Sequence, residues 1–163
     1  MPKDGLDEVQ KRFLDFAKKV AMKMGENGKS LTGVIGELSA CEKLGLSWEP
    51  QDGWDAERNN HTYQIKTRKN QKKDNPKENW WKQNKHRVDP NGRMGRFEGN
   101  TKWCFNTGLY VELDEEFEVW GIWELDKSGV EKLEKNHDLG LRISAFKKAA
   151  RIVYQKDSSN ALH

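Results

Sequence analysis

The sequence predicts an α/β fold in which a central mixed β-sheet of about four to five strands is flanked by helices. Three observations support this prediction. Apolar residues recur every three to four positions near the N-terminus, they alternate with polar residues in the middle of the chain, and a helical spacing returns near the C-terminus. The chain has 163 residues and no long linker-like stretch, so we expect one domain, 1–163.

Two helices are expected in the first quarter of the chain. Residues 6–24 have the period of an amphipathic helix. Its apolar residues are Leu6, Val9, Phe13, Phe16, Val20 and Met24. A second helix is expected from about Thr32 to Lys43, with Glu37 at the margin of its apolar face.

A β-hairpin is expected after the second helix. Residues 54–68 change to a two-residue period around Asn59-Asn60. Because Asn tolerates positive φ, this pair predicts a primed two-residue turn. Helix and hairpin together form the candidate site unit, residues 31–68.

The rest of the chain is expected to hold a long excursion and three further elements. Residues 69–100 are polar and basic, which is typical of a functional loop outside the core. Residues 103–125 predict a second hairpin, and residues 126–156 predict C-terminal helices. Ser128 and Glu131 have the spacing of a capping box that would open the first of these helices.

Positive charge is concentrated in one part of the chain. Between Lys66 and Lys102 there are twelve Lys or Arg against four Asp or Glu, a local balance of +8 in a chain whose net charge is +3. Such a segment is typical of a surface that contacts a polyanion, although a solvated loop is the plainer alternative. The residues expected to bind nucleic acid are Arg68, Lys69, Lys72, Lys73, Lys82, Lys85, Arg87, Arg93 and Arg96.

Cysteine use and hydropathy restrict the class of protein. Cys41 and Cys104 lie far apart in apolar surroundings, which argues against a disulfide framework and a cysteine-based zinc site. We expect both to be core thiols. There is no apolar secretory core and no apolar run of membrane-spanning length. We therefore expect a cytoplasmic protein without membrane contact.

The predicted hairpin brings chemically active residues together. Counting outward from the turn places Asp55 opposite Gln64, and because side chains alternate along a strand, Gln64 and Lys66 share one face. Asp55, Gln64 and Lys66 therefore converge, and Glu37 can reach them from the preceding helix. The opposite face can pack against a helix and consists of Trp54, Ala56, Tyr63, Ile65 and Thr67.

The chemistry of these side chains favours a hard metal ion. Two carboxylates, an amide oxygen and main-chain carbonyls form an all-oxygen site that suits Mg²⁺, with Mn²⁺ as a substitute, better than zinc. Such an ion polarises a phosphate and acidifies bound water. An adjacent ammonium, Lys66, can orient that water or stabilise charge that develops on the phosphate.

The order of these motifs resembles the PD-(D/E)XK nuclease superfamily, which has a restriction-endonuclease-like core. Its signature is an acid on one strand and acid-X-Lys on the next, here Gly53-Trp54-Asp55 and Gln64-Ile65-Lys66. The sequence is most similar to the branch with Gln in the second motif, seen in type IV restriction enzymes. In that branch a helix bearing Gly-Glu comes first, as Gly36-Glu37 does here. The resemblance covers roughly residues 30–69.

The resemblance implies a role for each residue of the motifs. Asp55 and Glu37 would hold the metal ion. Gln64 would contribute its side-chain oxygen, Ile65 its main-chain carbonyl, and Lys66 would assist the attacking water. The implied activity is Mg²⁺-dependent endonuclease hydrolysis of DNA, and a homodimer is compatible with it. A non-catalytic nucleic-acid-binding module on the same fold and a structural or partner-binding domain stay open as alternatives.

Overall fold

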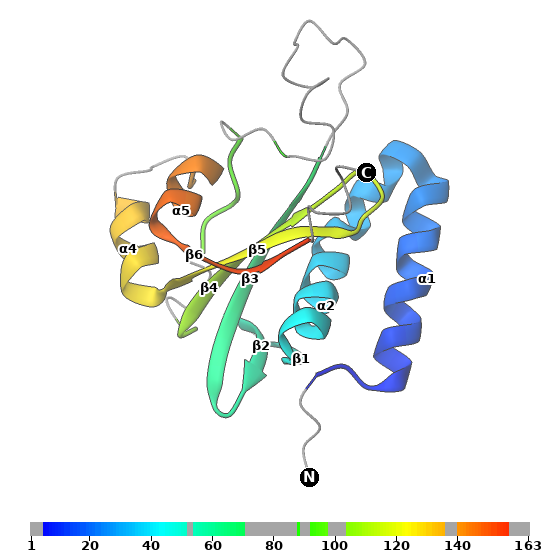
Figure 1. Cartoon of the computed structure of the whole chain (residues 1–163), viewed down its shortest axis with the longest axis horizontal. Helices are drawn as coiled ribbons and strands as arrows, with labels where there is room; N and C mark the ends of the chain where they lie inside the picture. Colours follow the sequence, from blue (N-terminus) through cyan, green and yellow to red (C-terminus); the bar gives the residue numbers. More distant parts are fainter. Residues whose placement is uncertain are drawn as a thin grey trace, which may run out of the picture.

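The chain forms a three-layer α/β structure with helices on both faces of one sheet (Figure 1). The computed structural model describes residues 5–51, 54–70, 88, 92–97, 104–135 and 140–156. Within these residues the sheet is mixed and has six strands. The predicted α/β class is confirmed, and the sheet is larger than the expected four or five strands.

The strands lie in the sheet in the order in which they occur in the sequence. They are β1 (Ser47–Gln51), β2 (Trp54–Arg58), β3 (His61–Lys69), β4 (Thr107–Leu113), β5 (Val119–Asp126) and β6 (Arg151–Gln155). Neighbouring strands are antiparallel except β3 and β4, which are parallel. Because parallel neighbours need a crossover, the connection from β3 to β4 returns to the end of the sheet where β3 begins.

The helices divide between the two faces, as Figure 1 shows. On one side lie α1 (Glu8–Met24), the 3-10 helix η1 (Gly25–Leu31) and α2 (Thr32–Leu44), with α2 against the strands and α1 packed on α2. On the other side lie α4 (Lys127–Lys135) and α5 (Ile143–Ala149). No helix in the described ranges is long and apolar enough to cross a membrane.

Each face of the sheet has its own core. Leu109 and Val111 of β4 pack with α1 and α2 in the first core, whereas Tyr110 packs with α4 and α5 in the second. This alternation follows from the two-residue period of a strand. Since both faces of β4 are covered, all of its residues are buried.

The N-terminal helix is confirmed, but its buried face is not the predicted apolar stripe. The side chain of Asp7 caps α1 in a reciprocal capping box with Gln10, and α1 ends at Gly25, whose φ is 59°. The residues of α1 that face the core are Leu14, Ala17 and Ala21. Small alanines let the helix approach α2 closely, so the larger apolar side chains point elsewhere.

The C-terminal part differs from the all-helical expectation for residues 126–156. Helices α4 and α5 form, but residues 151–155 are strand β6, paired with the edge of β5. The triplet 152–154 is Ile-Val-Tyr, and β-branched and aromatic residues favour strands when a free edge is available. Strand β1 was likewise not predicted.

Two smaller expectations are also corrected. The side chain of Asp126, not Ser128, caps α4, since its Oδ1 accepts a hydrogen bond of 2.8 Å from the main-chain nitrogen of Gly129. Cys41 is buried as expected, but Cys104 is exposed.

Candidate active site

The predicted β2–β3 hairpin is present with the predicted register. Asn59 and Asn60 adopt φ values of 52° and 64°, as a primed turn requires. Arg58 pairs with His61, and the pairing continues two residues further from the turn. The ladder ends at Ala56 and Tyr63, so the predicted pairing of Asp55 with Gln64, one step further on, is not part of it.

The carboxylate of Asp55 takes the place of a backbone group in the sheet. Regular pairing ends with Ala56 opposite Tyr63, and Oδ2 of Asp55 accepts a 2.8 Å hydrogen bond from the main-chain nitrogen of Ile65. In a continuous ladder this nitrogen would bond to the carbonyl of Trp54. The strands therefore separate at Asp55. Trp54 packs in the second core and Ala56 in the first, which corrects their predicted common face.

Glu37 reaches the hairpin because α2 packs very closely on β3. Gly36 faces Thr67, and a Cβ atom added at Gly36 would lie 1.9 Å from Oγ1 of Thr67. Only glycine permits this approach. The contact fixes the following residue, Glu37, beside the point where β2 and β3 separate.

A methyl group at position 36 should push the helix away from the strand. We expect Gly36→Ala to destabilise the fold by roughly 1–3 kcal/mol, the usual cost of overpacking a well-packed contact. Gly33 lies in the same helix with nothing within 4 Å of an added Cβ, so Gly33→Ala should instead stabilise by about 0.5–1 kcal/mol. Denaturant unfolding of the two variants measures both effects. Equal effects would show that the close contact is not present.

The carboxyl group of Glu37 keeps its proton near neutral pH and is hydrogen-bonded to Asp55. Burial, a hydrogen bond with Asp55 and the charge of Asp55 raise the pKa of Glu37 to about 8, and the ammonium of Lys66 opposes this shift. The three side chains therefore act on one another electrostatically. The same two carboxyl groups affect Cys41. Burial and the charges of Glu37 and Asp55 raise the pKa of its thiol.

This retained proton predicts how stability depends on pH without metal. A glutamate with a raised pKa binds a proton in the folded state that the unfolded state releases, from about 4.5 up to about 8. Its contribution to stability is therefore present below pH 4.5 and is lost as the pH rises through 8. Glu37→Gln should flatten this decline and exceed the wild type in stability at pH 8.

Chemical unfolding in EDTA at several pH values from 4.5 to 8.5 tests this expectation. Glu57→Gln is the matched control, because Glu57 is also a half-buried carboxyl group, two residues along β2 from Asp55. If wild type and Glu37→Gln lose stability in parallel, the pKa of Glu37 is not raised in the folded protein.

Lys66 lies on the face of β3 that α5 and the second core cover. Lys66 pairs with Tyr110 of β4 in the parallel register. The half-buried Gln64, two residues earlier on β3, lies on the same face. The Nζ atom of Lys66 lies 3.9 Å from the position that a Cβ atom at Gly95 would occupy. Gly95 therefore keeps a side chain away from the ammonium.

Arg93 and Arg96 were predicted to contact nucleic acid, but the sequence did not predict that their segment, residues 92–97, lies beside Lys66. Residues 92–97 run beside residues 140–143, with the main-chain nitrogen of Met94 2.9 Å from the carbonyl oxygen of Leu141. An isolated β-bridge between Arg93 and Arg142 joins the same two stretches. These contacts fix the segment above Lys66. The only sequence signal was its pair of glycines within the basic excursion.

Several of the predicted nucleic-acid-binding residues have structural contacts. The guanidinium of Arg68 donates to the carbonyl oxygens of Arg93 and Thr67, both at 2.9 Å. Arg93 donates to the carbonyl oxygen of Gly140. The ammonium of Lys69 lies 4.8 Å from the centre of the Phe117 ring, on the face opposite Lys66.

Of the other predicted cations, Arg96 is exposed next to Gly95. The remainder lie outside the described residues: Lys72, Lys73, Lys82, Lys85 and Arg87. Nucleic-acid contact by this set stays a prediction.

The residues present fit a divalent cation with oxygen ligands. Two crowded carboxyl groups retain a proton, and a cation relieves the same repulsion by replacing that proton. The carbonyl of Ile65 points to the same side of β3 as its N–H group, toward Asp55. Within the described ranges no three His, Cys, Asp or Glu side chains are placed to hold a metal. The other ligands would be main-chain, amide and water oxygens, as Mg²⁺ accepts.

Comparisons of the whole chain with protein-family models and with curated proteins found no match. The interpretation of the site therefore depends on its own residues and their geometry.

Proposed function

We propose that this protein is a Mg²⁺-dependent endonuclease that hydrolyses DNA phosphodiester bonds on a restriction-endonuclease-like core. The observation that supports this proposal most strongly is the hydrogen-bonded pair of Glu37 and Asp55 within electrostatic reach of Lys66. The helix bearing Gly36-Glu37, followed by the β2–β3 hairpin in a mixed sheet with helices on both faces, agrees with such a core.

The protein groups have distinct tasks in the proposed reaction. Glu37 and Asp55 would bind Mg²⁺, with the carbonyl of Ile65 and the amide oxygen of Gln64 completing the site. When bound, Mg²⁺ acts as a Lewis acid on the phosphate and lowers the pKa of its water. The hydrogen bond from Ile65 keeps the carboxylate of Asp55 oriented. That carboxylate therefore does not need to rearrange when it takes a ligand.

Lys66 supports the displacement at phosphorus. Its ammonium donates a hydrogen bond to the attacking water or to a phosphate oxygen, where negative charge grows in the transition state. Gly95 places no side chain next to this ammonium. The positively charged stretch from Lys66 to Lys102 supports the choice of a nucleic acid as substrate.

The test is cleavage by Asp55→Asn and by the control Glu57→Gln. Linear, nicked, branched and single-stranded DNA are incubated with each protein in Mg²⁺, Mn²⁺ or EDTA at low salt. We expect wild type and Glu57→Gln to cut at least one substrate with either metal, and Asp55→Asn to cut at least about 100-fold more slowly. Cleavage that survives in EDTA, or that Asp55→Asn retains, contradicts the proposed site.

A non-catalytic nucleic-acid-binding module is the second candidate. The observation that favours it is the set of only two carboxyl groups at the described part of the site, one of which keeps its proton at neutral pH. This candidate predicts binding of DNA that weakens steeply with salt, together with no cutting in any metal. The same incubations, followed by a binding assay in increasing salt, distinguish the two.

A further inference from the structure

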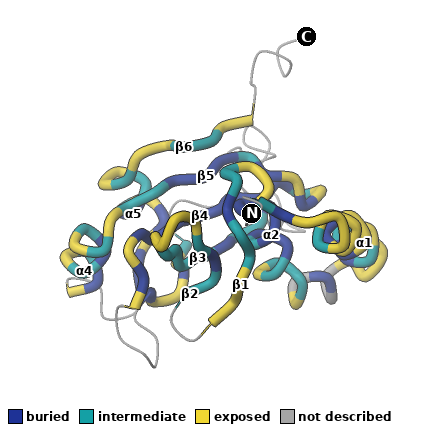
Figure 2. Tube along the Cα trace, turned by 90° about the horizontal axis from the view of Figure 1, so that it is seen from below, coloured by how far each residue is buried: buried dark blue, intermediate teal, exposed yellow. Residues whose placement is uncertain are grey.

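Helix α1 exposes an unusual amount of apolar surface. Six large hydrophobic side chains are exposed in the described residues, and five of them lie on α1: Val9, Phe13, Phe16, Met22 and Met24. The exposed fractions of Val9 and Phe16 are 75% and 65%. Figure 2 shows α1 at one edge of the molecule with much of its length exposed. Val9, Phe13 and Phe16 lie on one side of the helix and Met22 on another. Large exposed apolar patches mark interaction sites.

Three exposed residues and the half-buried Val20 form a seam with the spacing of a coiled coil. Val9, Phe13, Phe16 and Val20 are separated by four, three and four residues, which corresponds to alternating d and a positions of a heptad. The residues of α1 that pack on the protein itself, Leu14, Ala17 and Ala21, fall at b and e positions. The helix therefore has two apolar faces, and the second has no partner among the described residues.

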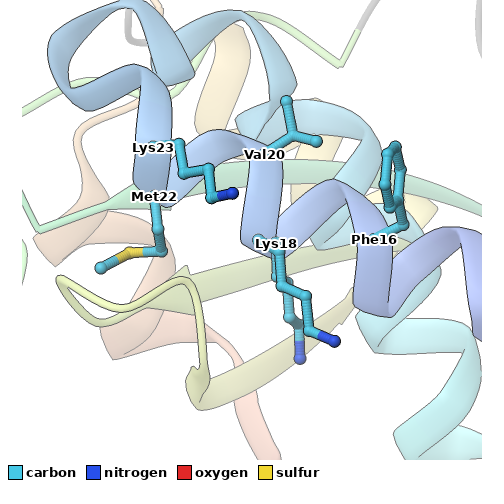
Figure 3. A pocket seen from close by; sticks show the side chains of 6 residues that line it. Phe16, Lys18, Val20, Met22 and Lys23 are labelled. Carbon is cyan, nitrogen blue, oxygen red and sulfur yellow. The ribbon is translucent and has the colours of Figure 1, made fainter.

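Positive charge borders one side of this seam. Arg12 and Lys19 occupy the two g positions, and both are exposed. Lys23 occupies the next d position, so the apolar seam ends at Val20. A shallow hollow along the helix is lined by apolar and cationic side chains together (Figure 3). Its lining residues are Phe16, Lys18, Lys19, Val20, Met22 and Lys23.

The charges disfavour a second copy of this helix as the partner. In an antiparallel pair g positions face each other, so Arg12 would meet Lys19 of the other copy. In a parallel pair g positions face e positions, and one of these is Ala17, which is buried against the body of the protein. Both arrangements of a homodimer through this seam are unfavourable.

We propose that α1 is a docking site for an amphipathic helix of another protein whose apolar stripe is bordered by Asp or Glu. The partner's apolar residues would cover Val9, Phe13, Phe16 and Val20. Its carboxylates would pair with Arg12 and Lys19, since charges at these heptad positions set the choice of partner. This docking site is independent of the candidate active site.

Two synthetic helical peptides test this proposal on the full chain. Both have three heptads with Leu at a and d, and one carries Glu at e and g while the other carries Lys. Fluorescence anisotropy should show that the Glu peptide binds at least about 10-fold more tightly than the Lys peptide. Phe16→Ser should weaken the binding of the Glu peptide at least about 10-fold.

Reversing the charges of Arg12 and Lys19 is a more specific test. The double variant Arg12→Glu/Lys19→Glu should prefer the Lys peptide, whereas Lys11→Glu, an exposed cation outside the seam, should behave as the wild type. Absence of binding, equal binding of both peptides, or an unchanged preference in the double variant overturns the proposal. Two further results would also overturn the proposal when no peptide binds. One is a dimer of this protein that Phe16→Ser abolishes, and the other is binding to anionic vesicles that Phe16→Ser abolishes.

Discussion

Replacing Lys66 by Met is expected to slow metal-dependent DNA cleavage by about 100- to 1,000-fold, the usual effect of removing one group that stabilises transition-state charge. Methionine keeps most of the apolar stem of the side chain but removes the ammonium. Because Glu37 and Asp55 remain, binding of the metal ion should persist. Single-turnover cleavage with saturating protein measures the chemical step, and a parallel binding assay shows that the substrate is still bound.

Lys69→Met is the matched control for this prediction. Lys69 is on the same strand as Lys66 but on the opposite face, where its ammonium lies over the ring of Phe117. Lys69 is itself one of the predicted nucleic-acid-binding residues, so its removal takes the same charge from the DNA-attracting set but leaves Glu37, Asp55 and Lys66 in place. If both variants lose cleavage equally, the effect is general electrostatic attraction of DNA, and Lys66 has no special role.

Replacing Lys147 by Met is expected to destabilise the fold by about 3–5 kcal/mol, as the loss of one partner from a buried ion pair does. The carboxylate of Glu112 is completely buried, and its Oε1 lies 2.7 Å from Nζ of Lys147 and 3.0 Å from the hydroxyl of Tyr110. Burial and the charge of Glu112 raise the pKa of Tyr110, so its hydroxyl stays protonated. The variant would leave Glu112 with this donor alone among the described residues.

Thermal unfolding tests the Lys147 prediction with two comparisons. Lys148→Met removes an exposed neighbouring cation and should change stability by no more than about 0.5 kcal/mol. Combining Lys147→Met with Glu112→Gln removes the uncompensated charge and should recover a large part of the loss. If the double variant is as unstable as Lys147→Met alone, the lysine acts through packing on Trp123. Its Nζ atom lies 4.3 Å from the centre of the Trp123 ring.

The part of the site that the sequence predicted depends on local chemistry. The pair Asn59-Asn60 forms the predicted turn, and this turn sets the predicted register from Arg58–His61 to Ala56–Tyr63. Glu37 was expected to reach the hairpin from the preceding helix. The structure adds the physical reason, which is the close approach of the helix to Thr67 at Gly36.

The features that were missed depend on partners distant in the sequence. Strand β6 forms because β5 offers an open edge, a condition that no local pattern reveals. Gly95 comes to lie above Lys66 only because residues 140–143 hold its segment in place. On α1, the spacing of apolar residues predicted the helix correctly but not which of its two apolar faces would be buried. Alanines bury less area than phenylalanines, yet they permit closer helix packing.

The central claim is that Glu37 and Asp55 are a metal site whose proton a divalent cation displaces. Titration calorimetry with Mn²⁺ at pH 7, in two buffers of different ionisation enthalpy, measures binding and proton release together. Because the pKa of Glu37 is about 8, wild type should release close to one proton for each ion bound, and Glu37→Gln should release none. Absence of Mn²⁺ binding, or binding that releases no proton and survives in Asp55→Asn, would contradict the claim.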